Sequence, residues 1–417
     1  MKVFKFGGAS VKDADSVRNI PTILSRYQEE ELVIIVSAMG KTTNALETLT
    51  DAAYKQGQET DEIFEDLYNY HLEIIKELFP DQNHDIYTHL DELFKALKMW
   101  LVILANPERE HPYDLYYDQI VPTGELLSTR IISSFLNEMG LENTWLDARD
   151  LIMTDSTHRA AIIDWEKTRQ KVGEAVKDKI SISQGFIGSD GSFTTSLGRE
   201  GSDFSAAIFA NVLDAEEVVV WKDVPGYLNA DPRYFKDTVK LDKISYAESI
   251  ELAFYGAKII HPKTIRPLKN KDIPLIVKSF LDPEAEGSVI HNDLSSDALV
   301  PSCIIKKEQV LISISSRDFS FIAADMLHHI FGIFTRHRCG INLMQNSAIS
   351  FSVCVDQSTR LQALMEELQE DFRVKYNDGL QLITIRHYDK PSIGRLTENK
   401  EILLEQRSRL TVQMVVK

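Results

Sequence analysis

The first ten residues of the chain have the pattern of a phosphate-binding turn. An apolar run from Val3 to Phe6 leads directly into Gly7 and Gly8, and Lys5 lies two residues before this glycine pair. Because glycine has no Cβ atom, the backbone N–H groups of such a turn can approach an anion closely, and the lysine adds a positive charge. Strand-to-helix turns also use glycine for geometry alone. The pattern therefore leaves phosphate binding and a purely structural turn open.

A second glycine-rich turn precedes a helix that we expect at residues 204–213. Gly201 and Ser202 can direct N–H groups toward an anion, and Ser202 or Asp203 can cap the helix. Capping alone does not account for Arg199, whose planar guanidinium group suits a carboxylate. These residue types favour a ligand site at this turn.

Polar residues stand at the ends of three further expected elements. Glu125 lies in the first turn of an amphipathic helix, where the helix dipole by itself favours an acid. Asp223 follows a strand expected at 218–221. Lys258 lies at the end of a helical pattern that Pro262 stops, so a plain helix C-terminus and phosphate binding are both open there.

Composition limits the classes of function. The chain has 63 acidic and 46 basic residues and a formal net charge of −17, which would repel a nucleic-acid backbone. The 3 cysteines are too few and too scattered for a disulfide framework or a zinc site, so we expect buried thiols in a reducing compartment. The chain begins with a strand pattern and contains no long uncharged apolar run. We therefore expect a soluble, cytoplasmic protein without a nucleic-acid partner, a membrane segment or a metal site of its own.

The elements that must position these residues follow an alternating order up to about residue 298. Short β-branched runs alternate with helical patterns, and the runs are 32–36, 180–183, 218–221 and 273–277. Strands that are apolar on both faces are typical of a mostly parallel sheet covered by helices. An acidic helical insertion at about 45–118 interrupts this order, and an apolar stripe over 90–104 marks one face of an amphipathic helix.

A loss of periodicity at 281–288 predicts a domain boundary near residue 300. The pattern beyond it is strand 310–315, helix 321–337, strand 341–345, strand 349–355, helix 359–368 and strand 372–376. This βαββαβ order is that of a ferredoxin-like unit. A further strand at 380–385 begins what reads as a shortened second copy, with later strands at 402–404 and 410–416.

Taken together and in this order, the motifs resemble those of the aspartate kinase (aspartokinase) family. They are Lys5-Phe6-Gly7-Gly8, Ser37-Ala38-Met39 with Thr42-Thr43-Asn44, Gly124-Glu125, Ser183-Gln184-Gly185-Phe186, Leu197-Gly198-Arg199 with Gly201-Ser202-Asp203, Asp231-Pro232-Arg233, and Gly256-Ala257-Lys258 with His261-Pro262. The resemblance implies an amino acid kinase-type three-layer α/β/α sandwich with a mostly parallel sheet at 1–298. It also implies an ACT domain at 303–376, a shortened second ACT-like unit at 377–417, and a homodimer formed through the ACT domains.

The activity that the resemblance implies is ATP-dependent phosphorylation of the β-carboxylate of L-aspartate to 4-phospho-L-aspartate. This is the first step of lysine, threonine and methionine biosynthesis. A carboxylate with a reference pKa of about 3.9 is already ionised at neutral pH, so the nucleophile needs no general base. The resemblance further implies that Mg²⁺ enters bound to the nucleotide phosphates.

The family's functional residues carry over to matching positions of this sequence. By that resemblance, Lys5, Gly7 and Gly8 hold the transferred phosphoryl group and Asp203 orients Lys5. The residues implied for aspartate are Ser37, Thr43, Glu125 for the ammonium, Arg199 for the α-carboxylate, and Ser202. The residues implied for ATP are Lys5, Gly8, Lys222, Asp223, Leu228, Arg233 and Lys258.

Regulation and two alternatives stay open. Lysine-sensitive members of the family carry acids where this chain has Asn342 and Ala348, so we expect weak or absent inhibition by lysine, while another amino-acid effector is open. One alternative is a kinase of the same fold for another acceptor, such as glutamate. The other is a non-catalytic amino-acid sensor, although a decayed site would be expected to lose some of its charged residues.

Overall fold

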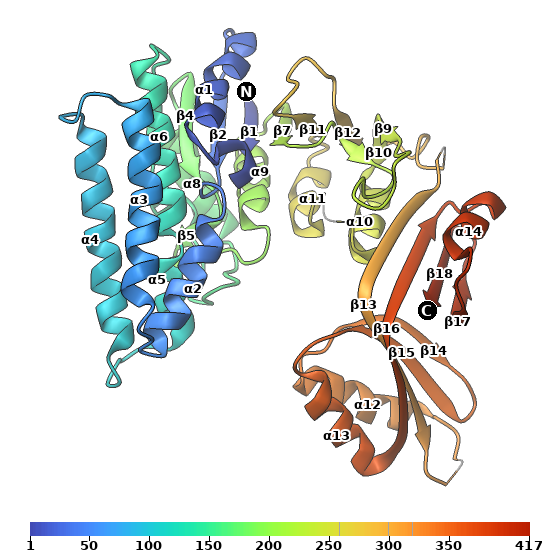
Figure 1. Cartoon of the computed structure of the whole chain (residues 1–417). Coiled ribbons are helices and arrows are strands. Elements are labelled where there is room, and N and C mark those ends of the chain that lie inside the picture. Colours follow the sequence, from blue (N-terminus) through green and yellow to red (C-terminus); the bar gives the residue numbers. More distant parts are fainter. Residues whose placement is uncertain (258, 299, 319) are drawn as a thin grey trace. The chain divides into compact units, whose positions relative to one another are not determined.

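The computed structural model describes residues 1–417 except 258, 299 and 319, and it divides into two compact units (Figure 1). The first unit comprises Met1–Tyr227, Asp242–Ala247 and Ile260–Leu294. The second comprises Leu228–Leu241, Glu248–Ile259 and Ser295–Lys417. The chain therefore passes from one unit to the other more than once.

The first unit contains an eight-stranded sheet with the order β10-β12-β11-β7-β1-β2-β4-β3. Its strands are β1 (Lys2–Phe6), β2 (Leu32–Val36), β3 (Thr144–Leu146), β4 (Ile180–Gln184), β7 (Glu217–Lys222), β10 (Lys243–Ser245), β11 (Leu275–Ser279) and β12 (Ser288–His291). All of these pairings are parallel except that of β11 with β12. Every residue of β2 is buried, as a strand with helices on both sides requires.

Helices cover this sheet as the alternating pattern predicts. They are α1 (Ala14–Leu24), α6 (Thr123–Glu138), α7 (Ala148–Leu151), α8 (Trp165–Ala175), α9 (Gly201–Val212) and α11 (Pro262–Lys269). Helix α9 packs on β1, β2 and β7, whereas α6 packs on β2, β3 and β4. The predicted α/β sandwich with a mostly parallel sheet is confirmed.

The acidic insertion folds into a cluster of helices. These are α2 (Thr42–Tyr54), α3 (Thr60–Leu78), α4 (Asp85–Ala105) and α5 (Tyr113–Ile120). The predicted stripe lies on α4, where Leu90, Phe94, Leu97, Leu101 and Leu104 are buried. Because α4 packs against α2, α3, α5 and α6, the stripe is the core of this cluster.

The second unit contains a six-stranded sheet with the order β14-β15-β13-β16-β18-β17. Its strands are β13 (Ser302–Ser316), β14 (Ile341–Asn346), β15 (Ser350–Asp356), β16 (Phe372–Arg386), β17 (Ile402–Arg407) and β18 (Thr411–Val416). Its helices are α12 (Ala324–Arg336), α13 (Leu361–Asp371) and α14 (Lys390–Thr397), and α10 (Tyr246–Tyr255) ends in it. The predicted βαββαβ order is present from β13 to β16.

The predicted strands of this unit are present, but two of the predicted strand boundaries are wrong. The strands predicted at 372–376 and 380–385 are one continuous strand, β16, and β13 begins at Ser302 rather than at residue 310. The turn-like sequence Asn377-Asp378-Gly379 falls where the pairing of β13 with β16 shifts register. A β-bulge absorbs the extra residues there, so the chain does not reverse. The expected first and second copies thus share one sheet.

The remaining elements are short. They are the 3-10 helices Gly8–Val11 and Ser25–Tyr27, the hairpin of β5 (Ile187–Ser189) with β6 (Thr194–Ser196), and the pair β8 (Tyr227–Leu228) and β9 (Lys240–Leu241). Cys303 and Cys354 are buried as expected, whereas Cys339 is only partly buried. In the described part of the chain, no helix has both the length and the apolar character needed to cross a membrane.

Candidate active site

A cavity of about 480 Å³ in the first unit brings together most of the predicted site residues. The predicted residues that line it are Lys5, Gly8, Ser37, Thr43, Glu125, Arg199, Ser202 and Asp203. They come from the ends of β1 and β2, from the segments that follow these strands, from the first turns of α2, α6 and α9, and from the turn before α9. Segments far apart in the sequence therefore converge on one concave site.

A buried ion pair forms the base of this cavity. Lys5 Nζ on β1 lies 2.6 Å from Asp203 Oδ1 on α9, and Lys222 Nζ at the end of β7 lies 3.6 Å from Asp203 Oδ2. Burial alone would raise the pKa of Asp203, but the two lysines outweigh it and hold that pKa below its usual value. The carboxylate is thus ionised and fixes the Lys5 ammonium at the cavity.

Gly8 allows the loops after β1 and β2 to touch. A Cβ atom at Gly8 would lie 2.8 Å from the Ala38 carbonyl oxygen and 2.9 Å from that of Gly40. The Gly40 N–H donates to the Gly8 carbonyl oxygen at 3.0 Å. Any larger residue at position 8 would separate the two loops. Gly7, beside the Lys5 ammonium, completes this backbone wall.

Glu125 is a buried acid with an unused acceptor. Its Oε1 accepts a hydrogen bond from the Ala38 N–H at 3.2 Å, while Oε2 has no hydrogen-bond partner among the described residues. Burial raises the pKa of Glu125 to about 8, although the Ala38 N–H and the Lys5 charge oppose the rise. A buried carboxyl of this kind is suited to receive a cation from a ligand.

Arg199 lies in the turn that leads into α9. Its side chain faces the cavity and makes no hydrogen bond or ion pair within the described part of the chain. Gly198 and Glu200 on either side have φ angles of +77° and +57°, so the turn is sharply bent. The arrangement presents an unpaired guanidinium group close to the N-terminus of a helix, which suits an anion.

Of the residues predicted to bind the nucleotide, Lys222 contacts a residue that lines the cavity, whereas Asp223 does not line it. Lys222 joins the ion pair described above, and Asp223 follows β7 in the first unit but does not line the cavity. Leu228 and Arg233 belong to the second unit, where Arg233 Nη2 lies 2.6 Å from Asp231 Oδ2. Lys258 lies outside the described residues.

Sequence reasoning missed several residues that line or support the cavity. Glu47 on α2 and Tyr117 on α5 come from the helical insertion, whereas Arg159 lies in a loop and Ser196 ends strand β6. The fully buried Asp118 accepts hydrogen bonds from the N–H groups of both Arg159 and Ser196. The sequence does carry one signal for this role, because Asp118 is an acid on the apolar face of α5, and buried acids are usually paired.

No group of three or more His, Cys, Asp or Glu side chains in the described part of the chain is arranged to hold a metal ion. Among the charged groups that line the cavity are the ion pair of Lys5 with Asp203, the acid Glu125 and the unpaired guanidinium group of Arg199. They can accommodate a ligand that carries both an ammonium and a carboxylate, next to a second anion at Lys5.

Residues 1–279 match the model of the amino acid kinase family. The chain is 30% identical over 400 residues to lysine-sensitive aspartokinase 3 of Escherichia coli K12, a match that covers 92% of this chain and 86% of that protein. This chain belongs to the aspartokinases of the amino acid kinase family. Another aspartokinase, chloroplastic aspartokinase 1 of Arabidopsis thaliana, is 30% identical over 407 residues, covering 92% of this chain and 70% of that protein.

Solved aspartokinase structures resemble the chain over its full length. Escherichia coli aspartokinase III in complex with lysine and aspartate has a TM-score of 0.83 at 27% identity, covering 100% of this chain and 96% of that chain. The same enzyme in complex with aspartate and ADP has a TM-score of 0.82, with the same identity and coverage. The aspartokinase resemblance therefore includes the C-terminal unit as well as the kinase unit.

Proposed function

We propose that this aspartokinase transfers the γ-phosphoryl group of ATP to the β-carboxylate of L-aspartate, forming 4-phospho-L-aspartate and ADP. The observation that carries the proposal is that one cavity contains Glu125 with an unused acceptor, the unpaired Arg199 and the fixed ammonium of Lys5. These three groups match the ammonium, the α-carboxylate and the reacting end of aspartate. The aspartate and ADP bound by the Escherichia coli relative support it.

The acceptor is held by charge complementarity. Arg199 binds the α-carboxylate with two parallel N–H donors, and the free oxygen of Glu125 accepts from the ammonium. The hydroxyl groups of Ser37, Thr43 and Ser202 orient the β-carboxylate. Because this carboxylate is ionised at neutral pH, it attacks phosphorus without a general base. The bond to ADP breaks as the acyl phosphate bond forms.

The chain's own residues limit the repulsion between the two anions. Lys5 holds the transferred phosphoryl group, the N–H groups of Gly7 and Gly8 approach its oxygens, and Asp203 keeps Lys5 in place. Mg²⁺ bound to the nucleotide phosphates would supply further charge neutralisation. The residues proposed to bind the rest of the nucleotide are Lys222, Asp223, Leu228, Arg233 and Lys258.

The C-terminal unit is proposed to be regulatory. Its βαββαβ order supports an ACT domain at 303–376 followed by a shortened ACT-like unit at 377–417. We propose that these form a homodimer and bind an amino-acid effector, in a cytoplasmic enzyme of amino-acid biosynthesis. A light-scattering mass of one chain, with no dimer at micromolar concentration, would contradict the dimer.

Trapping of the acyl phosphate with hydroxylamine tests the reaction directly. The purified protein is incubated with ATP, Mg²⁺ and either aspartate, glutamate or acetylglutamate. We expect hydroxamate only with aspartate. Hydroxamate from glutamate alone would assign a different acceptor, and its absence with every acceptor would favour the non-catalytic sensor.

A further inference from the structure

Arg159 lines the same cavity as Arg199, although it belongs to a different loop. The two loops touch, since a Cβ atom at Gly198 would lie 2.9 Å from the Arg159 carbonyl oxygen. The backbone of Arg159 is therefore next to the turn that carries Arg199. A second arginine thus lines the cavity, on a loop that touches the turn carrying Arg199.

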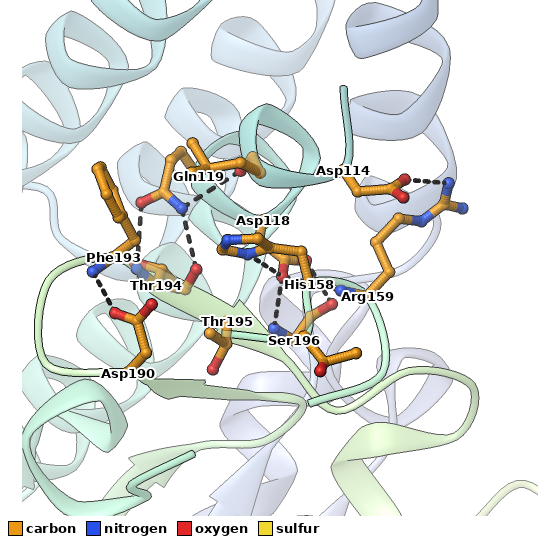
Figure 2. Close-up of polar contacts among 12 residues, drawn as sticks. Asp114, Asp118, Gln119, His158, Arg159, Asp190, Phe193, Thr194, Thr195 and Ser196 are labelled. Atoms are coloured by element: carbon orange, nitrogen blue, oxygen red, sulfur yellow. Dashed lines mark hydrogen bonds and ion pairs between the residues drawn. The ribbon is translucent and has the colours of Figure 1, made fainter. Parts of the chain in front are cut away.

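The backbone of Arg159 is held by a buried acid. Asp118 Oδ2 accepts the Arg159 N–H at 2.9 Å and contacts His158 Nδ1 at 3.0 Å (Figure 2). The same carboxylate accepts the Ser196 N–H at 3.0 Å and the Ser196 hydroxyl at 2.5 Å. Two lining residues, Arg159 in a loop and Ser196 at the end of β6, are thus fixed by one side chain of α5 (Figure 2).

The side chain of Arg159 is held in one orientation, but two of its guanidinium nitrogens make no hydrogen bond within the described part of the chain. Its guanidinium carbon lies 4.2 Å from the centre of the Tyr117 ring, a stacking contact, and Tyr117 in turn donates to Glu47 at 2.5 Å. Nη1 lies 3.2 Å from Asp114 Oδ1, but both side chains of this pair are about half exposed. Such surface pairs are weak. Nε and Nη2 have no partner within the described part of the chain.

The backbone conformation of Arg159 is unusual for its residue type. Its φ angle is +65°, a region that glycine and asparagine adopt more easily than arginine. Strained residues of this kind concentrate at ligand sites. The hydrogen bond to Asp118 uses only the backbone of Arg159, so it does not require an arginine side chain at this position.

We propose that Arg159 binds the α-carboxylate of the acceptor together with Arg199, and so selects acceptors with a free α-carboxylate. The proposal rests on the proposed aspartate kinase function. Two guanidinium groups can each donate to one carboxylate, and a planar fork stacked on a tyrosine keeps its donors aligned. The Lys5 end of the cavity stays available for the β-carboxylate.

Steady-state kinetics of Arg159→Gly and Arg159→Asn test this proposal. Both replacements suit a positive φ angle and keep the N–H that donates to Asp118, so the loop should keep its shape. We expect the KM for aspartate to rise about 10- to 100-fold, as loss of a charged hydrogen bond predicts. We expect kcat, the KM for ATP and the unfolding temperature to stay close to the wild-type values.

A pair of acceptors shows which group Arg159 contacts. The wild type should prefer L-aspartate over its α-amide, and the variants should lose much of that preference. Arg109→Gly is the matched control, because Arg109 also stacks on a tyrosine, Tyr54, at 4.2 Å but does not line the cavity. It should leave the KM for aspartate unchanged.

Three results would overturn the inference. They are an unchanged KM for aspartate, an equal rise in the KM for ATP, and an unchanged preference between aspartate and its α-amide. An equal rise for ATP would indicate a general electrostatic effect instead. Lack of aspartate phosphorylation by the wild type would contradict the proposed function itself. This outcome is seen without any variant, so it is distinct from a failure of the inference about Arg159.

Discussion

Glu125 must change its protonation state when aspartate binds in the proposed way. In the empty protein its pKa is about 8, because the carboxyl is buried. At neutral pH it is therefore mostly protonated, and a proton must leave before it can pair with the substrate ammonium. Aspartate binding and proton release are thus coupled at this residue.

The coupling predicts a pH-dependent affinity. As the pH increases toward about 8, the apparent affinity for aspartate should rise about tenfold for each pH unit, and above that pH it should level off. Aspartate KM from about pH 6 to about pH 9, together with calorimetry in buffers of different ionisation enthalpy, measures this. An aspartate KM that does not change over this range would show that Glu125 does not receive the ammonium. The KM for ATP serves as the control.

Replacement of the acid predicts opposite effects on stability and activity. The pKa of Glu125 is about 8 in the folded protein and its ordinary value is 4.5, so the stability of the wild type falls as the pH rises between these two values. The free energy of unfolding of Glu125→Gln should therefore equal that of the wild type near pH 4.5. Above a pH of about 8 it should exceed the wild-type value, by a few kcal/mol at most. Thermal unfolding at both ends measures this, and activity with aspartate should be lost. A variant less stable than the wild type at the higher pH would contradict the argument.

Lys5 should act mainly on the chemical step. Its ammonium is fixed by Asp203 and its charge is needed most while the phosphoryl group moves. Lys5→Ala should lower kcat by about a hundredfold or more, with a much smaller change in aspartate binding. Single-turnover rates and equilibrium binding separate the two effects. A variant that loses only aspartate affinity would assign Lys5 to the acceptor instead.

Among the helices, α5 gives the acidic insertion a direct part in the site. Gln119 Nε2 donates to the Thr194 carbonyl oxygen at 2.9 Å, and the Thr194 N–H donates back to Gln119 Oε1 at 3.2 Å (Figure 2). The side-chain amide thus pairs with β6 as a neighbouring strand would. Together with Asp118, it fixes the strand that leads into the turn of Arg199.

Asp118 should therefore affect activity by positioning Arg159 and Ser196 rather than by contacting the substrate. In Asp118→Asn, an amide N–H₂ replaces either Oδ2, which accepts the N–H groups of both Arg159 and Ser196, or Oδ1, which accepts the Ser196 hydroxyl. We expect a loss of about 1–3 kcal/mol in stability and an aspartate KM raised about tenfold. The KM for ATP should change little. Chemical denaturation and kinetics measure these effects, and equal rises in both KM values would indicate general disruption.

The strands of the second unit bear on lysine sensitivity. Asn342 Oδ1 accepts from Lys306 Nζ at 2.8 Å, and its Nδ2 lies 2.9 Å from both Gln309 Oε1 and Asp356 Oδ1. The Asn342 amide is thus engaged, and the Lys306 ammonium beside it would repel that of lysine. We expect little inhibition by millimolar lysine, unlike the lysine-sensitive relative. Loss of activity at submillimolar lysine would contradict this.

For the chain as a whole, local sequence patterns predicted the strands and the glycine turns but not the contacts between residues far apart in the sequence. The buried strand β2 and the turns around Gly8 and Gly201 carry their own signals, which are an apolar run for the strand and glycines for the turns. The contact of Asp118 with Ser196 spans 78 positions, so no nearby pattern reports it. The positive φ angle of Arg159 has no local signal either, because arginine rarely adopts it.

The repeated passage of the chain between the two units has a consequence for how such a protein can be altered. Within the second unit, the Cys303 N–H donates to the Asn229 carbonyl oxygen at 2.7 Å, and Arg386 Nε donates to Glu248 at 3.1 Å. A cut near residue 298 would strip the segments around Asn229 and Glu248 of these partners. No single break in the gene therefore yields two intact halves, and exchange of the C-terminal unit between relatives must carry these internal segments with it.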